Sequence, residues 1–168
     1  MAQSDQPKTI LVAVDFSAAS RIAFTRVLGF AGNASRIILV HVVARSSEQG
    51  ELSKVIEAAR ERLFSFSMGA DHDHAVRTMV RSGTPFQEIL AAAEEELAEL
   101  IVLAVHAPPV LAGLALGHTV DRVSRYAKCP VLLVREDEVA APATEGRIAS
   151  TLSSRSTAES PHRLRDFS

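Results

Sequence analysis

The sequence predicts an α/β fold: a five-stranded parallel sheet with helices on both faces, in a Rossmann-like arrangement. The first observation is that apolar segments alternate along the chain with segments whose apolar side chains recur at helical spacing. The second is that most apolar segments are nearly continuous runs of Val, Ile and Leu, which is typical of parallel strands buried on both faces. The third is a content of 47% hydrophobic but only 5% aromatic residues, without Trp, which predicts a core of Val, Leu, Ile and Ala.

The expected strands are short apolar or alternating segments. They are residues 9–15, 36–43, 74–81, 100–105 and 131–135. Residues 74–81 alternate apolar and polar side chains, which indicates a half-exposed strand or an edge strand. Because helical segments separate the strands, right-handed crossovers are expected to join them into a parallel sheet.

The expected helices are segments with apolar side chains three and four residues apart. They are residues 17–30, 51–68, 84–98 and 117–127. Ser17 is placed to cap the first helix. Thr84, Pro85 and Gln87 form a start signal for the third: a capping hydroxyl, proline in the first position and glutamine in the third.

The 168 residues fit one domain with extra segments. We expect residues 1–7 to be a flexible N-terminus and residues 8–136 to form the α/β domain. Residues 137–168, rich in Ala, Ser, Thr, Pro and Arg, are expected to be a disordered tail, with an ordered extra helix as the alternative. The first ten residues lack the pattern of a secretory signal, and no apolar run reaches the roughly 18 residues of a membrane span.

Charge and cysteine content argue against several classes of function. The net charge of −2 gives no electrostatic reason to expect binding to nucleic acid or to a membrane surface. The single cysteine, Cys129, cannot form an intramolecular disulfide, which fits a reducing compartment. Since it stands beside Pro130 at the start of an apolar strand, its thiol is expected to be inert. Residues 70–74 gather Asp and His at the amino-terminal end of a strand, away from the expected site, so no metal site is expected.

In an open parallel sheet, ligands bind beyond the carboxyl ends of the strands, near the point where strand order reverses. Asp15 closes the first strand, where its carboxylate can bond a ribose or an adenine amine, cap the first helix, or do both. Gly83 either admits a ligand close to the backbone or supplies a positive φ to a turn. His41, within an apolar strand, is expected to be a hydrogen-bonded core residue. His106, at a strand end, is either a ligand contact or an exposed loop residue.

The most informative stretch is residues 100–134, in which strand, small-residue loop, helix and strand follow one another. Gly117, His118 and Thr119 open the helix, where free N–H groups, an imidazole and a hydroxyl can meet a phosphate. Alternatively, His118 or Thr119 simply caps the helix, with Asp121 at the positive end of its dipole. No arrangement of nucleophile and base emerges, so catalytic residues are not expected.

The order of these segments resembles the universal stress protein family over about residues 7–136. The segments that carry the resemblance are KTILVAVDFSAAS (8–20), IILVHVV (37–43), SGTPFQEIL (82–90) and, most specifically, residues 100–134. The resemblance implies a cytoplasmic stress-response protein that forms homodimers through the last strand, 131–135. It also implies binding of ATP or AMP, with Mg²⁺ accompanying ATP, without strong catalytic activity.

ATP-binding members of that family carry Gly, two residues, Gly, nine residues, Gly, and then Ser, Thr or Asn. In this chain the first two glycines fall on Ala104 and Ala107, the third on Gly117 and the hydroxyl position on His118. Where the motif needs a positive φ, each alanine would cost roughly 1–2 kcal/mol. Pro108 and Pro109 also lack N–H donors for an anion. The phosphate half of the site is therefore expected to be weakened.

Together, the strand ends and the resemblance give a set of candidate nucleotide-binding residues. They are Ala13, Asp15, Val42, Val43, Gly83, Leu103, Ala104, His106, Ala107, Gly117, His118 and Thr119. Three functions remain open: a homodimer with a weakened adenine-nucleotide site, a dimeric interaction module that binds unknown protein partners but no nucleotide, and a weak nucleotide hydrolase. The dimer also has a physical argument, because the apolar strand 131–135 would otherwise leave an open sheet edge.

Overall fold

The computed structural model describes residues 6–44, 49–68, 74–105 and 117–135 of the chain. The elements in chain order are β1 (Thr9–Ala13), α1 (Ala18–Phe30), β2 (Arg36–Val43), α2 (Gln49–Met68), β3 (Ala75–Ser82), α3 (Pro85–Glu95), β4 (Leu100–Val105), α4 (His118–Tyr126) and β5 (Val131–Arg135). Each expected strand and helix is present, with small differences at the ends. The N-terminal and C-terminal segments expected to be flexible lie largely or wholly outside the described residues.

The sheet is parallel throughout and has the strand order β3-β2-β1-β4-β5. The chain builds outward from β1 through β2 to β3, and then returns to place β4 against the other side of β1. In this register Leu11 lies between Ile38 of β2 and Ile101 of β4. The strand order therefore reverses between β1 and β4, which is where a ligand site is expected in such a sheet.

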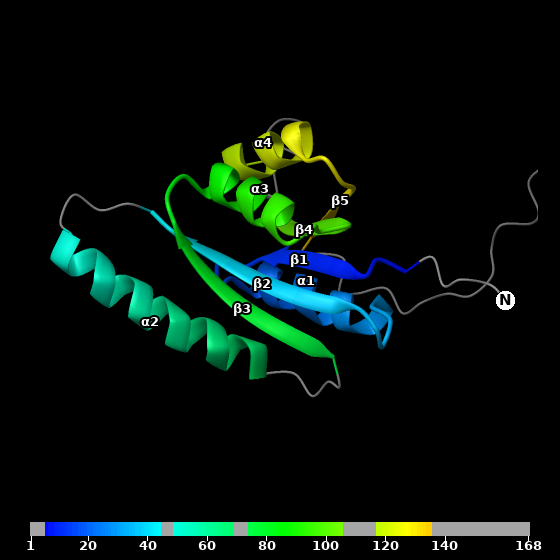
Figure 1. The fold of residues 1–168 in the computed structure, drawn as a ribbon, viewed down its shortest axis with the longest axis horizontal. Coiled ribbons are helices and arrows are strands. Elements are labelled where there is room, and N and C mark those ends of the chain that lie inside the picture. Colours follow the sequence, from blue (N-terminus) through cyan, green and yellow to red (C-terminus); the bar gives the residue numbers. More distant parts are fainter. Residues whose placement is uncertain (1–5, 45–48, 69–73, 106–116, 136–168) are drawn as a thin grey trace, which may run out of the picture.

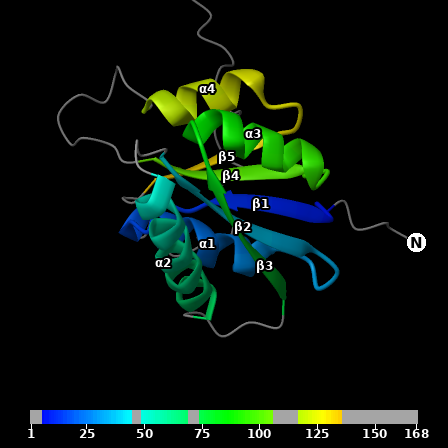
Figure 2. The same ribbon diagram turned by 60° about the vertical axis from the view of Figure 1, so that its left-hand side comes forward.

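Helices cover both faces of the sheet (Figure 1). Figure 2 shows α3 and α4 together on one face and α1 and α2 on the other. This layering follows from the strand order, because α1 and α2 cross in one direction along the sheet and α3 and α4 cross in the other. The predicted fold is confirmed.

Two hydrophobic cores result from this layering. The core under α1 and α2 contains Ile10, Val12, Val14, Ala23, Phe24, Val27, Ile37, Leu39, Leu63, Phe66, Val102 and Val134. The core under α3 and α4 contains Leu11, Ile38, Val40, Ile89, Ala92, Ala93, Ile101, Leu103, Val105, Val120 and Val123. Val, Leu, Ile and Ala dominate as predicted, and Phe24 and Phe66 complete the first core. Alternate residues of β1 enter opposite cores, since successive side chains of a strand point to opposite faces.

The turn between β1 and α1 is fixed by short polar contacts. Ser17 caps α1 as predicted, and its hydroxyl oxygen accepts a hydrogen bond from the N–H of Ser20 at 3.1 Å. The carboxylate of Asp15 in turn accepts from the N–H of Ser17 at 3.0 Å and from its hydroxyl. β1 ends at Ala13, two residues earlier than expected, although the N–H of Val14 still donates to Val40 O at 2.8 Å.

The bounds of α3 differ from the prediction. Thr84 occupies the N-cap position, but its side chain makes no capping hydrogen bond, so that part of the start signal is wrong. The helix ends at Glu95 rather than near residue 98, because Leu97 adopts a left-handed φ of 52°. The N–H of Ala98 then donates to Ala93 O at 2.8 Å, which satisfies one of the carbonyls that a helix end leaves free.

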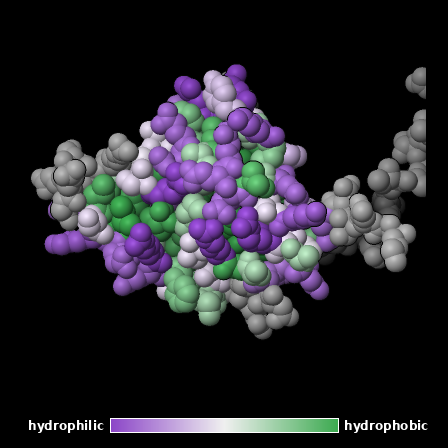
Figure 3. All heavy atoms as spheres, in the orientation of Figure 1, coloured by the Kyte–Doolittle hydropathy of each residue, from purple (hydrophilic) through white to green (hydrophobic). Residues whose placement is uncertain are grey.

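The surface of the described residues is mixed. Figure 3 shows hydrophilic side chains over much of one face, with apolar side chains visible between them. Of the large apolar side chains, Phe64 and Met68 of α2 are among the most exposed, at 60% and 69%. Within the described part of the chain, no helix combines the length and apolar character needed to cross a membrane.

Candidate functional site

A cavity of about 350 Å³ opens at the carboxyl edge of the sheet. It lies where β1, β2 and β4 end and where α3 and α4 begin, next to the reversal of strand order. Its lining consists of Ala13, Val14, Asp15, Val40, His41, Val42, Pro85, Ile89, Leu103, Ala104, Gly117, His118, Thr119 and Val120. Apolar side chains from the strands form most of the wall, and polar groups come from the turn after β1, from β2 and from the start of α4.

Most of the described candidate residues meet at this cavity. Ala13, Asp15, Val42, Leu103, Ala104, Gly117, His118 and Thr119 all line it. Val43 and Gly83 are not in its lining; they bond to each other instead, with the N–H of Gly83 donating to Val43 O at 3.0 Å. His106 and Ala107, and likewise Pro108 and Pro109, lie outside the described residues.

Asp15 has the helix-capping environment that was one of its two expected roles. Its Oδ1 accepts both hydrogen bonds from Ser17, so the carboxylate holds the residue that caps α1. The same residue is exposed and lines the cavity. The helix role is therefore observed, and contact with a ligand remains a prediction for the same carboxylate.

His41 belongs to the cavity wall as well as to the sheet. Its Nδ1 lies 2.7 Å from Val14 O, and because a carbonyl oxygen can only accept, Nδ1 carries the hydrogen. In the neutral ring Nε2 is then an acceptor. The predicted hydrogen bond of His41 is present, and His41 also lines the cavity. Its place near the carboxyl end of β2 is the sequence signal for this.

Phe16 packs against His41 from the turn after β1, at a ring-centroid distance of 4.4 Å. Phe16 has a φ of 64°, a left-handed conformation that is unfavourable for a residue with a side chain. Its ring is held by the guanidinium of Arg62 at 4.2 Å and by the ring of Phe66 at 6.1 Å. Packing of the side chain therefore stabilises the strained turn that places Asp15 at the cavity.

The start of α4 forms another side of the cavity. Gly117 occupies the N-cap position, and no side chain makes a capping hydrogen bond there. The alternative in which His118 or Thr119 caps the helix is therefore wrong. Instead, the ring of His118 packs edge-on against Phe86 at 5.9 Å, and Arg122 lies over the same ring at 5.5 Å. Asp121 is in the first turn, as expected from the helix dipole.

The structure requires a glycine at one of the two candidate positions, Gly83, but not at the other, Gly117. Gly83 has a φ of 157°, and a Cβ built there would lie 2.5 Å from Oε1 of Glu88. The turn itself therefore requires Gly83, which favours the structural alternative for that residue. Gly117 has an ordinary φ of −51°, and a Cβ there would meet nothing within 4 Å. The fold as described places no demand for glycine at position 117.

Ala104 does not carry the backbone cost expected for an alanine that replaces a glycine. It lies in β4, paired with Val134 of β5. Among the described residues other than glycine, only Phe16 and Leu97 have a positive φ. The conditional cost of roughly 1–2 kcal/mol for a positive φ therefore does not apply at Ala104. What remains there is the methyl group, which stands in the cavity wall.

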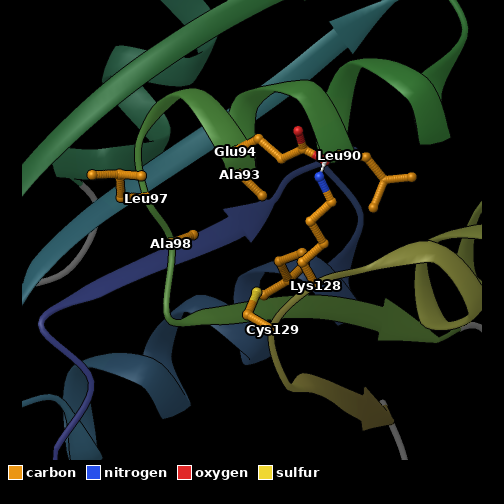
Figure 4. A pocket seen from close by; sticks show the side chains of 8 residues that line it. Leu90, Ala93, Glu94, Leu97, Ala98, Lys128 and Cys129 are labelled. Atoms are coloured by element: carbon orange, nitrogen blue, oxygen red, sulfur yellow. Dashed lines mark ion pairs between the residues drawn. The ribbon is translucent and has the colours of Figure 1, made fainter.

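A second hollow, of about 310 Å³, lies beside the C-terminal half of α3 and the segment that enters β5 (Figure 4). Lys128 reaches across it to Glu94, with Nζ 3.0 Å from Oε1. Burial raises the pKa of the Cys129 thiol at its floor, which disfavours the reactive thiolate and agrees with an inert thiol. This hollow contains none of the candidate nucleotide-binding residues.

The described residues contain no group of three or more His, Cys, Asp or Glu side chains placed to hold a metal ion. Of the histidine-rich stretch 70–74, only His74 is described; its Nε2 lies 3.1 Å from Ala31 O. Residues 70–73 lie outside the described part of the chain, so the expectation of no metal site there stays a prediction.

Comparison with known proteins decides the family. The family model of the universal stress protein family matches residues 7–135. The chain belongs to the universal stress protein family. The universal stress protein MJ0577 of Methanocaldococcus jannaschii is 26% identical over an alignment 153 positions long, which covers 76% of this chain and 94% of the relative. The solved structure of MJ0577 has a TM-score of 0.64 at 27% identity, over 76% of this chain and 95% of its own.

Other solved universal stress proteins share the fold. UspA of Lactobacillus plantarum has a TM-score of 0.59 at 24% identity, over 77% of this chain and 99% of its own. A universal stress protein in complex with cAMP has a TM-score of 0.54 at 24% identity, over 77% of this chain and 98% of its own. The five-stranded parallel architecture is thus the family's fold.

The candidate nucleotide-binding residues did not include several residues that line the cavity. They are Val14, Val40, His41, Pro85, Ile89 and Val120. Pro85 and Ile89 belong to the first turns of α3, the helix that follows the end of β3. The expectation that ligands lie at strand ends would have found them if it had been extended to the first turn of each following helix.

Proposed function

We propose that this universal stress protein binds an adenine nucleotide in the carboxyl-edge cavity as a regulatory ligand, with a weakened phosphate half and without strong catalytic activity. The apolar strand ends supply walls for a base. Asp15 supplies a carboxylate for hydroxyl or amine groups, and the start of α4 supplies N–H groups for a phosphate. The methyl group of Ala104 stands in the cavity wall, and Pro108 and Pro109 have no N–H groups to offer to further phosphates.

The main support for this proposal is that a glycine, Gly117, stands at the start of α4. A glycine is favoured where a backbone must approach a ligand closely, and neither a positive φ nor a close contact with a described residue requires one at position 117. The N-cap position favours glycine as well as Ser, Thr, Asn and Asp, but only the other four bring a side chain that can bond the first turn. A glycine there leaves the N–H groups of α4 open toward the cavity.

The comparisons support an adenine nucleotide as the class of ligand. One solved universal stress protein is a complex with cAMP, which is an adenine nucleotide. That observation concerns the relative. It supports the proposal here because the two chains share the fold and this chain places a cavity at the reversal of strand order.

Calorimetric titration of the purified chain with ATP, ADP and AMP, with and without Mg²⁺, tests the proposal. We expect binding of at least one nucleotide, with dissociation constants between micromolar and millimolar. No heat and no shift of the melting temperature at millimolar nucleotide would contradict it and favour the interaction module. Steady release of phosphate that is abolished by Asp15→Ala or His118→Ala would favour the hydrolase.

The variant Gly117→Ala separates a ligand role from a structural role. Because the added methyl meets no described atom, we expect the free energy of unfolding to fall only by the weaker N-cap preference of alanine, about 1 kcal/mol. We expect the nucleotide affinity of the folded variant to be lower by about tenfold, or about 1.4 kcal/mol. Gly29→Ala is the matched control: Gly29 lies in α1, and a Cβ there also meets nothing within 4 Å. Equal affinity of both variants and wild type would remove the main support for the proposal.

The proposal includes a homodimer formed through β5, and the cytoplasmic location that the family resemblance implies. Within the described sheet, β5 pairs only with β4, so its other edge is open. Residues 131–134 of this strand are all apolar. An apolar edge of this kind is stabilised by pairing with another strand. Strand pairing with a second copy would satisfy its free backbone groups.

A further inference from the structure

The lining of the carboxyl-edge cavity contains few charged side chains. Asp15 is the only Asp, Glu, Lys or Arg residue among its described lining residues. The other polar side chains of the lining are the imidazoles of His41 and His118 and the hydroxyl of Thr119. A phosphate group in this cavity would therefore meet one like charge and no lysine or arginine from the described lining.

Three described arginines near the carboxyl edge of the sheet have other partners. Arg62 lies over Phe16, and Arg122 lies over Phe86. Arg81, at the end of β3, is paired with Glu88 at 2.7 Å and with Glu95 at 2.6 Å. Releasing any of these guanidinium groups for a phosphate would break a contact that the fold uses.

The sequence of the segment between β4 and α4 adds no fixed positive charge. Residues 106–116 read HAPPVLAGLAL and contain neither Lys nor Arg. Two of these residues are prolines, which have no N–H group to donate to an anion. Among the described lining residues, the start of α4 is the helix N-terminus that offers N–H groups to a phosphate, and a single helix N-terminus supplies only about half an elementary charge.

Each additional phosphate increases the charge that must be paired or kept in water. An unpaired charge that loses water is disfavoured far more strongly than the hydroxyl and amine groups of an uncharged nucleoside. We infer that this cavity selects adenine ligands with at most one phosphate group, such as adenosine, AMP or a cyclic monophosphate, over ADP and ATP. This inference rests on the proposed function and specifies the ligand class of the same site.

Titration of the full chain with adenosine, AMP, cAMP, ADP and ATP at one ionic strength, in EDTA, tests the inference. We expect each of the first three to bind at least tenfold more tightly than ATP. Equal or tighter binding of ATP would overturn the inference and leave the proposed function intact. Binding of none of the five would overturn both. Because these measurements use the unmodified chain, they do not depend on the folding of any variant.

A charge-adding variant tests the physical cause. His118→Arg places a guanidinium at the cavity entrance, and we expect it to raise the affinity for ATP about tenfold relative to that for adenosine. Ser124→Arg, on the same helix but outside the lining, is the matched control and should leave the ratio of the two affinities unchanged. An unchanged ratio in His118→Arg, with an unchanged melting temperature, would contradict the role given to missing positive charge.

Arg122 is a cation one turn after His118, on the helix whose start lines the cavity. Arg122→Gln removes its charge while keeping much of its length. We expect this variant to bind adenosine and ATP in the same ratio as wild type. A selective tenfold loss of ATP affinity would show that Arg122 pairs with phosphate and would overturn the inference.

Discussion

At the scale of single residues, a turn at the carboxyl edge has a strained backbone conformation that side-chain packing stabilises. Phe16 adopts a left-handed φ of 64° and is stabilised by His41, Phe66 and Arg62 around its ring. Backbone strain of this kind tends to persist at functional sites, where the surrounding packing determines the conformation. Here it keeps the Asp15 carboxylate at both the start of α1 and the cavity.

Gly83 provides the residue-scale stability prediction. Gly83→Ala should lower the free energy of unfolding by about 1–3 kcal/mol, because the new Cβ would have an unfavourable φ and would displace Glu88 from Arg81. Urea denaturation of the variant and wild type measures this. Gly29→Ala, in the exposed part of α1, should be neutral or slightly stabilising, because alanine favours helix. Equal stability of Gly83→Ala and wild type would show that the turn adapts freely.

At the scale of elements, ion pairs attach α3 to β3. Arg81 donates to both carboxylate oxygens of Glu95, at 2.6 and 3.1 Å, and to Glu88 at 2.7 Å. Hydrogen bonds from Arg81 hold the pKa of the Glu95 carboxyl below its ordinary value of 4.5. The hydrogen bond with Glu95, and after it the one with Glu88, raises the pKa of Arg81. This attachment sets the position of Pro85 and Ile89, which line the cavity.

The pKa of Glu95 gives a prediction about pH. Because it is lower in the folded than in the unfolded chain, its ion pair stabilises the fold above the ordinary pKa, and this contribution is lost as the pH falls through the lowered pKa. Glu95→Gln should therefore be less stable than wild type at pH 7, with a difference that shrinks below about pH 4. Chemical denaturation across this pH range measures it.

Glu57 offers the control for that experiment. It forms a single exposed hydrogen bond with Arg60 at 3.3 Å, so Glu57→Gln should change stability less than Glu95→Gln at neutral pH. A stability difference between Glu95→Gln and wild type that stays constant from pH 7 to pH 3 would contradict the assigned ion pair.

At the scale of the whole molecule, the two edges of the sheet differ. The β3 edge carries Arg77 and Arg81, which are paired with glutamates of α3 and of its C-cap. Charged side chains on an edge strand discourage pairing with another strand. β5 has only Arg135 at its end, and Leu132 in its middle is 37% exposed. This contrast favours β5 as the strand that pairs in the proposed dimer.

The dimer prediction follows from that contrast. Leu132→Lys should convert the dimer to a monomer at tens of micromolar, because each copy would bring a charge into the pairing edge. Sedimentation velocity measures this. Ala75→Lys puts the same charge on the β3 edge and should leave the dimer intact. A wild-type chain that sediments as a monomer at this concentration would contradict the prediction directly.

The sequence predicted much of this molecule because its patterns are local. The bounds of β2, β4 and β5 agree with the residues expected, since each is a continuous apolar run that ends in a clear change of composition. The end of α3 was missed because Leu97, rather than a glycine, takes the left-handed conformation. The missing cap at Thr84 depends on a side-chain orientation that no sequence pattern specifies.

What the sequence determined by itself is the parallel α/β fold, the family and the neighbourhood of the candidate site, because strand ends and helix starts can be located from apolar spacing. Only the tertiary structure decided which side chains meet there. It added His41 and Pro85 to the cavity and left Val43 and Gly83 outside its lining. It also showed that Gly83 serves the turn, whereas Gly117 has an ordinary φ and no close contact with a described residue. Such distinctions depend on distances between separate elements, and these are set by packing across the sheet.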